Sequence, residues 1–219
     1  MKTVAVIPIK LNSERLPNKN IKTFSNGVPL CKYIFNILLK TNEIDEIYVY
    51  CSSEKIKEYM PAKIKFLRRD TSLDRNEATM NDVLNSFVNE IDADIYVLTH
   101  VTSPFLNYKD FDECIRKIKN NEYDSAFSVR RVQDFLWKDG SALNYNLENI
   151  PRTQDLPCIY KETCGFYIFK DEVIKKLNRR IGNKPYFCEV SEVEAIDINN
   201  AFDFEIADYL CGKVGRKYE

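Results

Sequence analysis

The most constraining feature of this sequence is an unbroken apolar run at residues 4–7, which is rich in β-branched side chains. A run without polar alternation is typical of a strand buried on both faces, and such strands form parallel sheets that helices cover. The run ends abruptly at Pro8, where we expect a loop to begin. The sequence therefore predicts an α/β fold around a mostly parallel sheet with helices on both faces.

Apolar runs and segments of helical spacing alternate along the rest of the chain, without internal repeats. A last strand is expected to end in Asp197 and Asn199, before a closing helix that Asp203 caps or supports. Residues two apart on a strand share a face, so Asp197 and Asn199 are expected to point the same way. The other patterns predict strands at residues 44–51, 64–67, 94–99, 125–129 and 166–169, and helices at residues 29–39, 54–59, 80–91 and 111–119.

The loop after the first strand carries three cations, Lys10, Arg15 and Lys19, together with the amide of Asn12 and the hydroxyl of Ser13. A loop at the carboxyl end of the first strand of an open α/β sheet is where ligands bind. Cations, hydroxyls and amides at such an edge suit a polyphosphate. We therefore interpret this segment as a nucleotide-binding loop, with simple solvated charge as the alternative.

Composition limits the classes of function. The 219 residues fit a single domain, residues 1–219, and the net charge of −1 indicates no broad surface for nucleic acid or an anionic membrane. No apolar stretch approaches the length of a membrane span, about 20 residues, and the N-terminus lacks a signal-peptide pattern. The seven cysteines include no C-x-x-C pair, which argues against a zinc site and a disulfide framework. We expect a cytoplasmic protein without nucleic-acid or membrane partners.

Residues 8–19 read P-x-K-x-x-S-x-R-L-P-x-K, where x is any residue. This pattern resembles the opening signature of the CMP-sugar synthetases, which comprise the N-acylneuraminate cytidylyltransferases and their CMP-KDO synthetase relatives. Lys10 replaces a family arginine, and Asn12 stands where the family has a glycine. Asparagine tolerates left-handed backbone angles, so we expect Asn12 to preserve the turn. The resemblance implies a Rossmann-like nucleotidyltransferase fold of the glycosyltransferase-A-like kind.

Three further blocks carry the same resemblance in the same order. Residues 102–104 keep the family's Thr-Ser-Pro, with His100 in place of a glutamine and Leu106 in place of an arginine that contacts the acceptor sugar. Residues 151–157 match the family's Pro-Arg-x-Gln-x-Leu-Pro, and residues 197–199 read Asp-Ile-Asn where the family has the Asp-x-Asp that holds Mg²⁺. For His100 we weigh a general base against a partly buried structural imidazole and favour the latter.

The resemblance implies a cytidylyltransferase that transfers CMP from CTP to a small acidic sugar of the nonulosonic type, releases pyrophosphate and serves cell-surface glycan biosynthesis. The implied catalytic residues are Lys10, Arg15, Lys19 and Asp197. The implied nucleotide-binding residues are Pro8, Lys10, Asn12, Ser13, Arg15, Lys19, Arg69, Asn76 and Thr102. The implied acceptor-binding residues are His100, Lys138, Gln154 and Lys161. The implied cofactor is Mg²⁺, held by Asp197 with Asn199.

Residues 130–157 are too long for a plain connection and carry aromatic side chains without clear periodicity. The resemblance implies that they form a protruding dimerisation arm, which crosses to the second subunit of a homodimer. The alternative is a lid that folds over the active site of its own subunit.

Two other functions stay open. One is a nucleotidyltransferase of the same fold that uses another nucleotide or a phosphorylated or non-sugar acceptor, which the changes at Leu106 and Asn199 suggest. The other is a non-catalytic relative that binds nucleotide without turning it over. A Rossmann-type dehydrogenase is disfavoured, because no G-x-G-x-x-G follows the first strand.

Overall fold

The computed structural model describes residues 1–13 and 15–214, and its centre is a seven-stranded sheet with the order β3-β2-β1-β4-β8-β5-β9. All neighbouring strands are parallel except β8, which runs antiparallel to both β4 and β5. The mostly parallel sheet that the sequence predicted is thereby confirmed. The strands are β1 (Thr3–Ile9), β2 (Glu46–Cys51), β3 (Lys65–Arg68), β4 (Ile95–Thr99), β5 (Ser125–Val132), β8 (Ile159–Lys170) and β9 (Pro185–Glu189).

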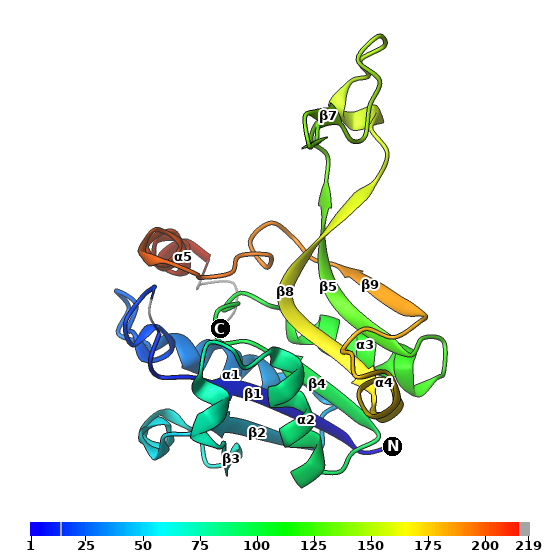
Figure 1. The fold of residues 1–219 in the computed structure, drawn as a ribbon. Helices are drawn as coiled ribbons and strands as arrows, with labels where there is room; N and C mark the ends of the chain where they lie inside the picture. The colour runs from blue at the N-terminus through cyan, green and yellow to red at the C-terminus, as the bar shows by residue number, and fades with distance from the viewer. Residues whose placement is uncertain (14, 215–219) are drawn as a thin grey trace.

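Helices cover both faces of the sheet (Figure 1). Ala5 and Ile7 of β1 belong to the hydrophobic cluster under α1, α3 and α5, whereas Val4 and Val6 belong to the cluster under α2 and α4. The apolar run at the start of the sequence thus reflects a strand buried on both faces. Within the described residues, none of the helices combines the length and apolar character that a bilayer crossing requires. The helices are α1 (Leu30–Lys40), α2 (Met80–Glu90), α3 (Tyr108–Lys119), α4 (Asp171–Leu177) and α5 (Ala201–Val214), with the short 3-10 helices η1 (Lys19–Ile21), η2 (Glu54–Tyr59), η3 (Thr71–Asp74) and η4 (Thr153–Asp155).

The first strand is longer than predicted, because β1 continues through Pro8 and ends at Ile9. Residues 8 and 9 pair with β2, whereas β4 accompanies β1 only as far as Val6. At Pro8 the strand therefore has a neighbour on one side only, and proline is tolerated where a strand lacks a neighbour.

The other predicted strands and helices are present with shifted ends, apart from the strand expected before α5. Residues 191–200 form turns and loop instead. Their apolar alternation reflects the burial of Ile198 in the core, while the Ile198 N–H bonds to the loop after β4 rather than to a strand. A strand-like pattern here comes from a buried loop without a pairing partner.

Beyond the sheet, β5 and β8 continue as a two-stranded ribbon that carries the arm predicted for residues 130–157 (Figure 1). Its tip holds a small hairpin of β6 (Trp137–Lys138) and β7 (Ser141–Ala142), which stands away from the sheet in Figure 1. At the base of the ribbon the register between β5 and β8 shifts after Phe127, and Cys164 takes a φ of 57°. Such an irregularity bends and twists a strand pair, and here it lies where the ribbon leaves the sheet.

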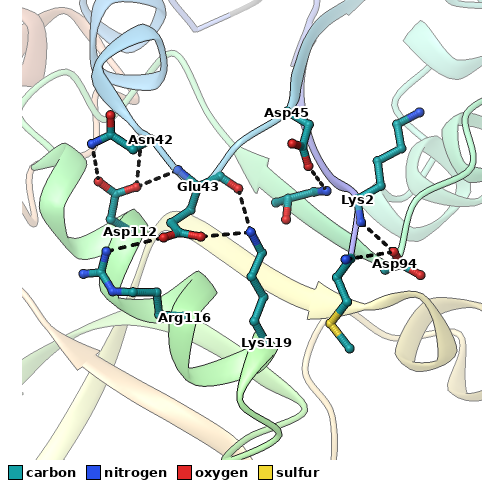
Figure 2. A network of polar contacts seen from close by, with 10 residues as sticks. Lys2, Asn42, Glu43, Asp45, Asp94, Asp112, Arg116 and Lys119 are labelled. Carbon is teal, nitrogen blue, oxygen red and sulfur yellow. Dashed lines mark hydrogen bonds and ion pairs between the residues drawn. The ribbon is translucent and has the colours of Figure 1, made fainter.

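The amino edge of the sheet is held by aspartates that accept hydrogen bonds from backbone N–H groups (Figure 2). Asp45, just before β2, accepts from the Thr3 nitrogen at 2.7 Å. Asp112 of α3 is buried and accepts from the backbone nitrogens of Asn42 and Glu43 at 2.8 Å and 2.9 Å. These contacts join α3 and the start of β1 to the loop between α1 and β2, so this edge stabilises the fold.

Replacing Asp112 with alanine should lower the free energy of unfolding by about 1–3 kcal/mol, because two backbone N–H groups lose a charged acceptor. Urea denaturation followed by circular dichroism measures this loss. Asp92→Ala is the control, since Asp92 is 91% exposed and forms a surface ion pair with Lys175. Its effect should stay below about 0.5 kcal/mol. Equal stabilities of the two variants would contradict the structural role of Asp112.

Candidate active site

Three segments that are far apart in the sequence meet at the carboxyl edge of the sheet. The Lys19 ammonium donates a hydrogen bond from Nζ to the Ile198 carbonyl at 2.7 Å, and the Ile198 N–H donates to the Thr102 carbonyl at 2.9 Å. The loop after β1, the loop after β4 and the segment before α5 are therefore fixed to one another. Asp197 precedes Ile198 and is brought to the basic loop in this way.

Local hydrogen bonds shape the loop after β1. The Lys19 N–H donates to the Leu16 carbonyl at 3.1 Å, and the side-chain amide of Asn20 donates to the Lys10 carbonyl at 2.8 Å. Among the described residues of this loop, the one in a left-handed conformation is Asn18, with a φ of 54°, and not Asn12. The expectation that Asn12 preserves a left-handed turn is therefore wrong, because the chain makes that turn further along with another asparagine.

The loop borders an open pocket of about 720 Å³, to which η3 and the residues after it contribute the opposite wall. A smaller hollow of about 190 Å³ shares several of its residues and extends to Asn199. Ligand pockets commonly measure about 300–1,000 Å³, so the larger one has room for a nucleoside. Most of the residues predicted to bind nucleotide line these two hollows, namely Lys10, Asn12, Ser13, Arg15, Lys19 and Asn76.

Arg69, also predicted to contact nucleotide, has a different local role. Its side chain is only 4% exposed, and its guanidinium donates to the Ile9 carbonyl at 3.1 Å and pairs with Asp74. Asp74 also accepts a hydrogen bond from the Ser52 hydroxyl. Arg69 thus braces the end of β1, next to half-buried Pro8, and supports the place from which the basic loop starts.

Charges of both signs surround Lys19. Burial is the main cause that lowers the pKa of Lys19; the charge of Asp197 opposes this shift, that of Arg15 adds to it, and that of Asp203 opposes it. Two cations and two carboxylates therefore lie within electrostatic range of one another in a partly desolvated place. Such an arrangement suits a polyphosphate that arrives with a divalent cation, because each partner finds opposite charge.

The segment before α5 is ordered by its own side chains. Asp203 accepts from the backbone nitrogens of Asn199 and Asn200 at 2.8 Å and 3.0 Å, and the Asn200 side chain accepts from the Asp203 nitrogen at 3.0 Å. This reciprocal pair caps α5, which confirms the role expected for Asp203. The Asn199 side-chain amide donates to the Asp197 carboxylate at 2.8 Å, so these two side chains meet although they lie on a loop.

The donors near Asp197 fit a metal that is shared with a ligand. Within the described residues, no cluster of three or more His, Cys, Asp or Glu side chains could hold a metal ion by itself. One carboxylate, from Asp197, and one amide oxygen, from Asn199, remain as oxygen donors. Mg²⁺ is commonly bound by one or two carboxylates, with substrate phosphates and waters supplying the other oxygens.

His100 lies half-buried beside the site. Burial lowers the pKa of His100 to about 4; the charge of Arg180 lowers it too, that of Asp197 raises it and that of Lys19 lowers it. The imidazole is therefore neutral near neutral pH and a weak base, which agrees with the structural interpretation and disfavours a general base.

Arg180 is a site residue that sequence reasoning missed. It lies between α4 and β9, and its guanidinium packs over the Tyr167 ring at 4.2 Å from the ring centroid. No motif marks this position, because its place depends on how the segment after α4 folds back onto β8. Leu106, in contrast, is 2% exposed and would contact a side chain added at Gly165, so it belongs to the core.

The predicted acceptor-binding residues divide into two groups. Lys138 and Gln154 are exposed on the arm, and Lys161 is exposed on the ribbon below it. The arm that carries Lys138 and Gln154 stands away from the sheet in Figure 1, whereas His100 follows the last residue of β4.

His100 is the only histidine of the chain, so NMR can follow its ring signals directly. We expect these signals to titrate near pH 4 rather than near the ordinary 6.5. Between these values the unfolded chain binds a proton that the folded chain does not, so stability falls as the pH is lowered through that window. His100→Gln should remove this component. A midpoint near 6.5 would show that the imidazole is not desolvated.

Comparison with known proteins gives a consistent result. A family model described as cytidylyltransferase matches residues 4–189. N-acylneuraminate cytidylyltransferase A of Danio rerio is 28% identical, over 93% of this chain and 49% of that protein. The Helicobacter pylori protein named pseudaminic acid cytidylyltransferase and UDP-2,4-diacetamido-2,4,6-trideoxy-beta-L-altropyranose hydrolase is 26% identical, over 94% of this chain and 42% of that protein. The chain spans about half the length of the first curated relatives it matches.

A solved structure of CMP:2-keto-3-deoxy-manno-octonic acid synthetase complexed with CTP matches 97% of this chain and 99% of that chain, with a TM-score of 0.74 and 15% identity. This likeness shows the fold, and it confirms the nucleotidyltransferase fold expected from the sequence. Since the family model covers most of the chain, the chain belongs to the cytidylyltransferase family.

Proposed function

We propose that this chain is a CTP-dependent cytidylyltransferase that transfers CMP from CTP to an acidic sugar of the nonulosonic type and releases pyrophosphate. The observation that carries the proposal is the 2.7 Å hydrogen bond from Lys19 to the Ile198 carbonyl, which sets the basic loop beside Asp197. Cations next to a metal-binding carboxylate are what a nucleoside triphosphate requires. Family membership supports CTP, and the names of the relatives support a sugar acid.

In this proposal the triphosphate lies along the loop after β1. Arg15 and Lys19 contact the β- and γ-phosphates, and Lys10 contacts the α-phosphate. An oxygen of the acceptor attacks the α-phosphorus in line, the bond to the bridging oxygen breaks and pyrophosphate leaves with that oxygen. The fixed cations hold the phosphate oxygens in place and offset the charge that develops on the leaving group.

The larger pocket is the proposed place for the cytidine. Asn12 and Ser13 line it from one side and Asn76 from the other, and the Lys10 ammonium donates to the Asn76 side chain at 3.3 Å. Amides and hydroxyls can supply both donors and acceptors to a base and a ribose. Arg69 supports this pocket by fixing the end of β1 through the Ile9 carbonyl. Thr102 supports it by accepting a hydrogen bond from Ile198 in the segment before α5.

Mg²⁺ is the proposed cofactor, with Asp197 and the amide oxygen of Asn199 as its protein ligands. When bound, it would neutralise negative charge on the triphosphate. Asn199 keeps its hydrogen bond to the Asp197 carboxylate at 2.8 Å and thereby fixes the direction of that carboxylate. Because only one protein ligand is charged, the chain itself should bind the metal weakly and take it up together with CTP.

The arm is proposed to make a homodimer in which each chain completes the acceptor site of the other. Lys138, Gln154 and Lys161 would then lie near His100 of the second subunit. Exposed apolar side chains gather on residues 130–157, although monomers usually expose few of them in one place. They are Phe135, Trp137, Leu143, Leu147 and Ile150.

We further propose that the product serves cell-surface glycan biosynthesis and that the reaction takes place in the cytoplasm. The cysteines agree with a reducing compartment, since no disulfide joins those of the described residues.

Lys19→Ala and Asp197→Ala should each lower the rate of pyrophosphate release by about a hundredfold or more, the effect of losing one preorganised charge-stabilising group. Pyrophosphate is measured with CTP, Mg²⁺ and a panel of sugar acids. Lys32→Ala and Glu205→Ala are matched controls, because both side chains are exposed on helices and line neither hollow. Rates near that of the wild type in Lys19→Ala or Asp197→Ala would remove that residue from the mechanism.

Two further results, one from thermal denaturation with added nucleotides and one from the pyrophosphate assay, would favour the alternatives. Stabilisation against heat by UTP, GTP or ATP, but not by CTP, would indicate a nucleotidyltransferase with another nucleotide. Intact CTP after long incubation with every acceptor would indicate a non-catalytic nucleotide-binding protein.

The arm is tested separately through the oligomeric state. The double variant Trp137→Asp, Ile150→Asp should be monomeric by light scattering coupled to size-exclusion chromatography, because it places charges in the proposed apolar contact. Phe202→Asp should remain dimeric, since this 68% exposed side chain lies on α5 and not on the arm. A monomeric wild type, or a double variant that still dimerises, would refute the arm's role in assembly.

A further inference from the structure

Arg180 is held in a fixed orientation by one aromatic residue. Its guanidinium carbon lies 4.2 Å from the centroid of the Tyr167 ring, and its NH2 group donates to the Tyr167 hydroxyl at 3.4 Å. That hydroxyl in turn donates to the Glu162 carboxylate at 2.8 Å. A guanidinium that stacks on a buried ring loses much of its rotational freedom before any ligand arrives.

Arg180 lies close to the end of β4, which leads into His100, one of the residues proposed to bind the acceptor. Tyr167 on β8 pairs with Leu98 on β4, and both side chains belong to the hydrophobic cluster under α2 and α4. Thr99, the last residue of β4, pairs with Phe166, the neighbour of Tyr167, and His100 follows Thr99 directly. The guanidinium on Tyr167 therefore lies beside the end of β4, and its charge acts on the imidazole.

His100 is affected by charges from several segments. The charges that act on Lys19 come from Asp197, Arg15 and Asp203, whereas Arg180, Asp197 and Lys19 act on His100. An acceptor bound at His100 would therefore lie in the field of Arg180.

The guanidinium retains donors for a ligand. Arginine has five N–H donors, and the Tyr167 hydroxyl accepts from one of its nitrogens. Among residues 1–13 and 15–214, no carboxylate lies within ion-pair distance of Arg180. Its charge is therefore not neutralised in the way that Asp74 neutralises Arg69.

We propose that Arg180 is a specificity-determining residue of the acceptor site, which binds a planar oxygen-bearing group of the acceptor, an acyl carbonyl or a carboxylate. This inference rests on the proposed function. Arg180 is held against β8, whereas Lys19 and Asp197 lie on the loop after β1 and on the segment before α5. The neutral imidazole of His100 can hydrogen-bond the acceptor without adding a charge.

Steady-state kinetics with two acids tests the proposal. One is N-acetylneuraminate, and the other is its analogue with a hydroxyl in place of the acylamino group. Arg180→Met should lower kcat/KM for the acceptor by about 10- to 100-fold, which corresponds to the loss of a charge-assisted hydrogen bond. The KM for CTP should change by less than about twofold, which is smaller than the effect of losing such a hydrogen bond. Arg180→Lys should restore part of the loss, because lysine keeps the charge but not the planar fork.

Arg179→Met is the matched control, since Arg179 is the neighbouring arginine, is exposed and donates to the Asn183 side chain. A loss with N-acetylneuraminate alone would assign the acyl carbonyl to Arg180, and a loss with both acids would assign the carboxylate. Arg180→Met and Arg179→Met variants with equal acceptor kinetics would overturn the proposal, and so would a loss that appears mainly in the KM for CTP.

A binding measurement separates this inference from the proposed function. The ring signals of His100, the only histidine, should shift when either acid is added to the wild type or to Arg179→Met, and should shift only at much higher concentration in Arg180→Met. If the acids shift these signals but no pyrophosphate is released from CTP, the result supports the acceptor site and contradicts the proposed reaction. If neither acid shifts them in the wild type, the role of Arg180 is refuted, whatever the reaction with CTP.

Discussion

The hydrogen bond from the Lys19 ammonium to the Ile198 carbonyl, between residues 179 positions apart, is the interaction on which the candidate site depends. It closes the loop after β1 against the segment before α5 and so places Asp197 beside the basic residues. Its acceptor is a backbone carbonyl without a full charge, so the ammonium is positioned but not neutralised. A lysine held in this way can still bind an anion, whereas one in a close ion pair would first have to leave its carboxylate.

The two edges of the sheet use charged residues for different purposes. At the amino edge, Asp45 and Asp112 accept hydrogen bonds from backbone nitrogens and fasten the loop between α1 and β2. At the carboxyl edge, Lys10, Arg15 and Lys19 face hollows. The buried Arg69, which pairs with half-buried Asp74, braces the end of β1 from which their loop starts. Most contacts that stabilise the fold at the amino edge are thus separated in space from the cations that line the hollows at the carboxyl edge.

Much of the sheet could be predicted from the sequence, because strands buried on both faces leave continuous apolar runs that few other structures produce. The end of β1 could not, since the tolerance of Pro8 depends on how far β4 extends along it. The strand predicted at residues 197–199 is absent. Alternation of apolar and polar residues indicates which side chains are buried, and a buried segment need not pair with a strand.

The candidate site could be predicted where chemistry is concentrated in a short segment, as in the loop after β1. Asn12 shows the limit, because the residue type that tolerates a left-handed turn occurs more than once in the loop and the turn is made at Asn18. Arg180 had no signal in the sequence, since its position follows from the stacking on Tyr167 and from the pairing of β8 with β4. The pKa of His100 likewise depends on burial and on charges from distant segments.

The central claim is that Asp197 and the basic loop hold one metal–triphosphate group between them. A crystal structure with CTP and Mn²⁺, examined by anomalous scattering at the manganese edge, tests it most directly. The account predicts a manganese peak at the Asp197 carboxylate, with the triphosphate lying along Arg15 and Lys19. A manganese peak elsewhere in the chain, or a triphosphate bound away from the loop after β1, would contradict it.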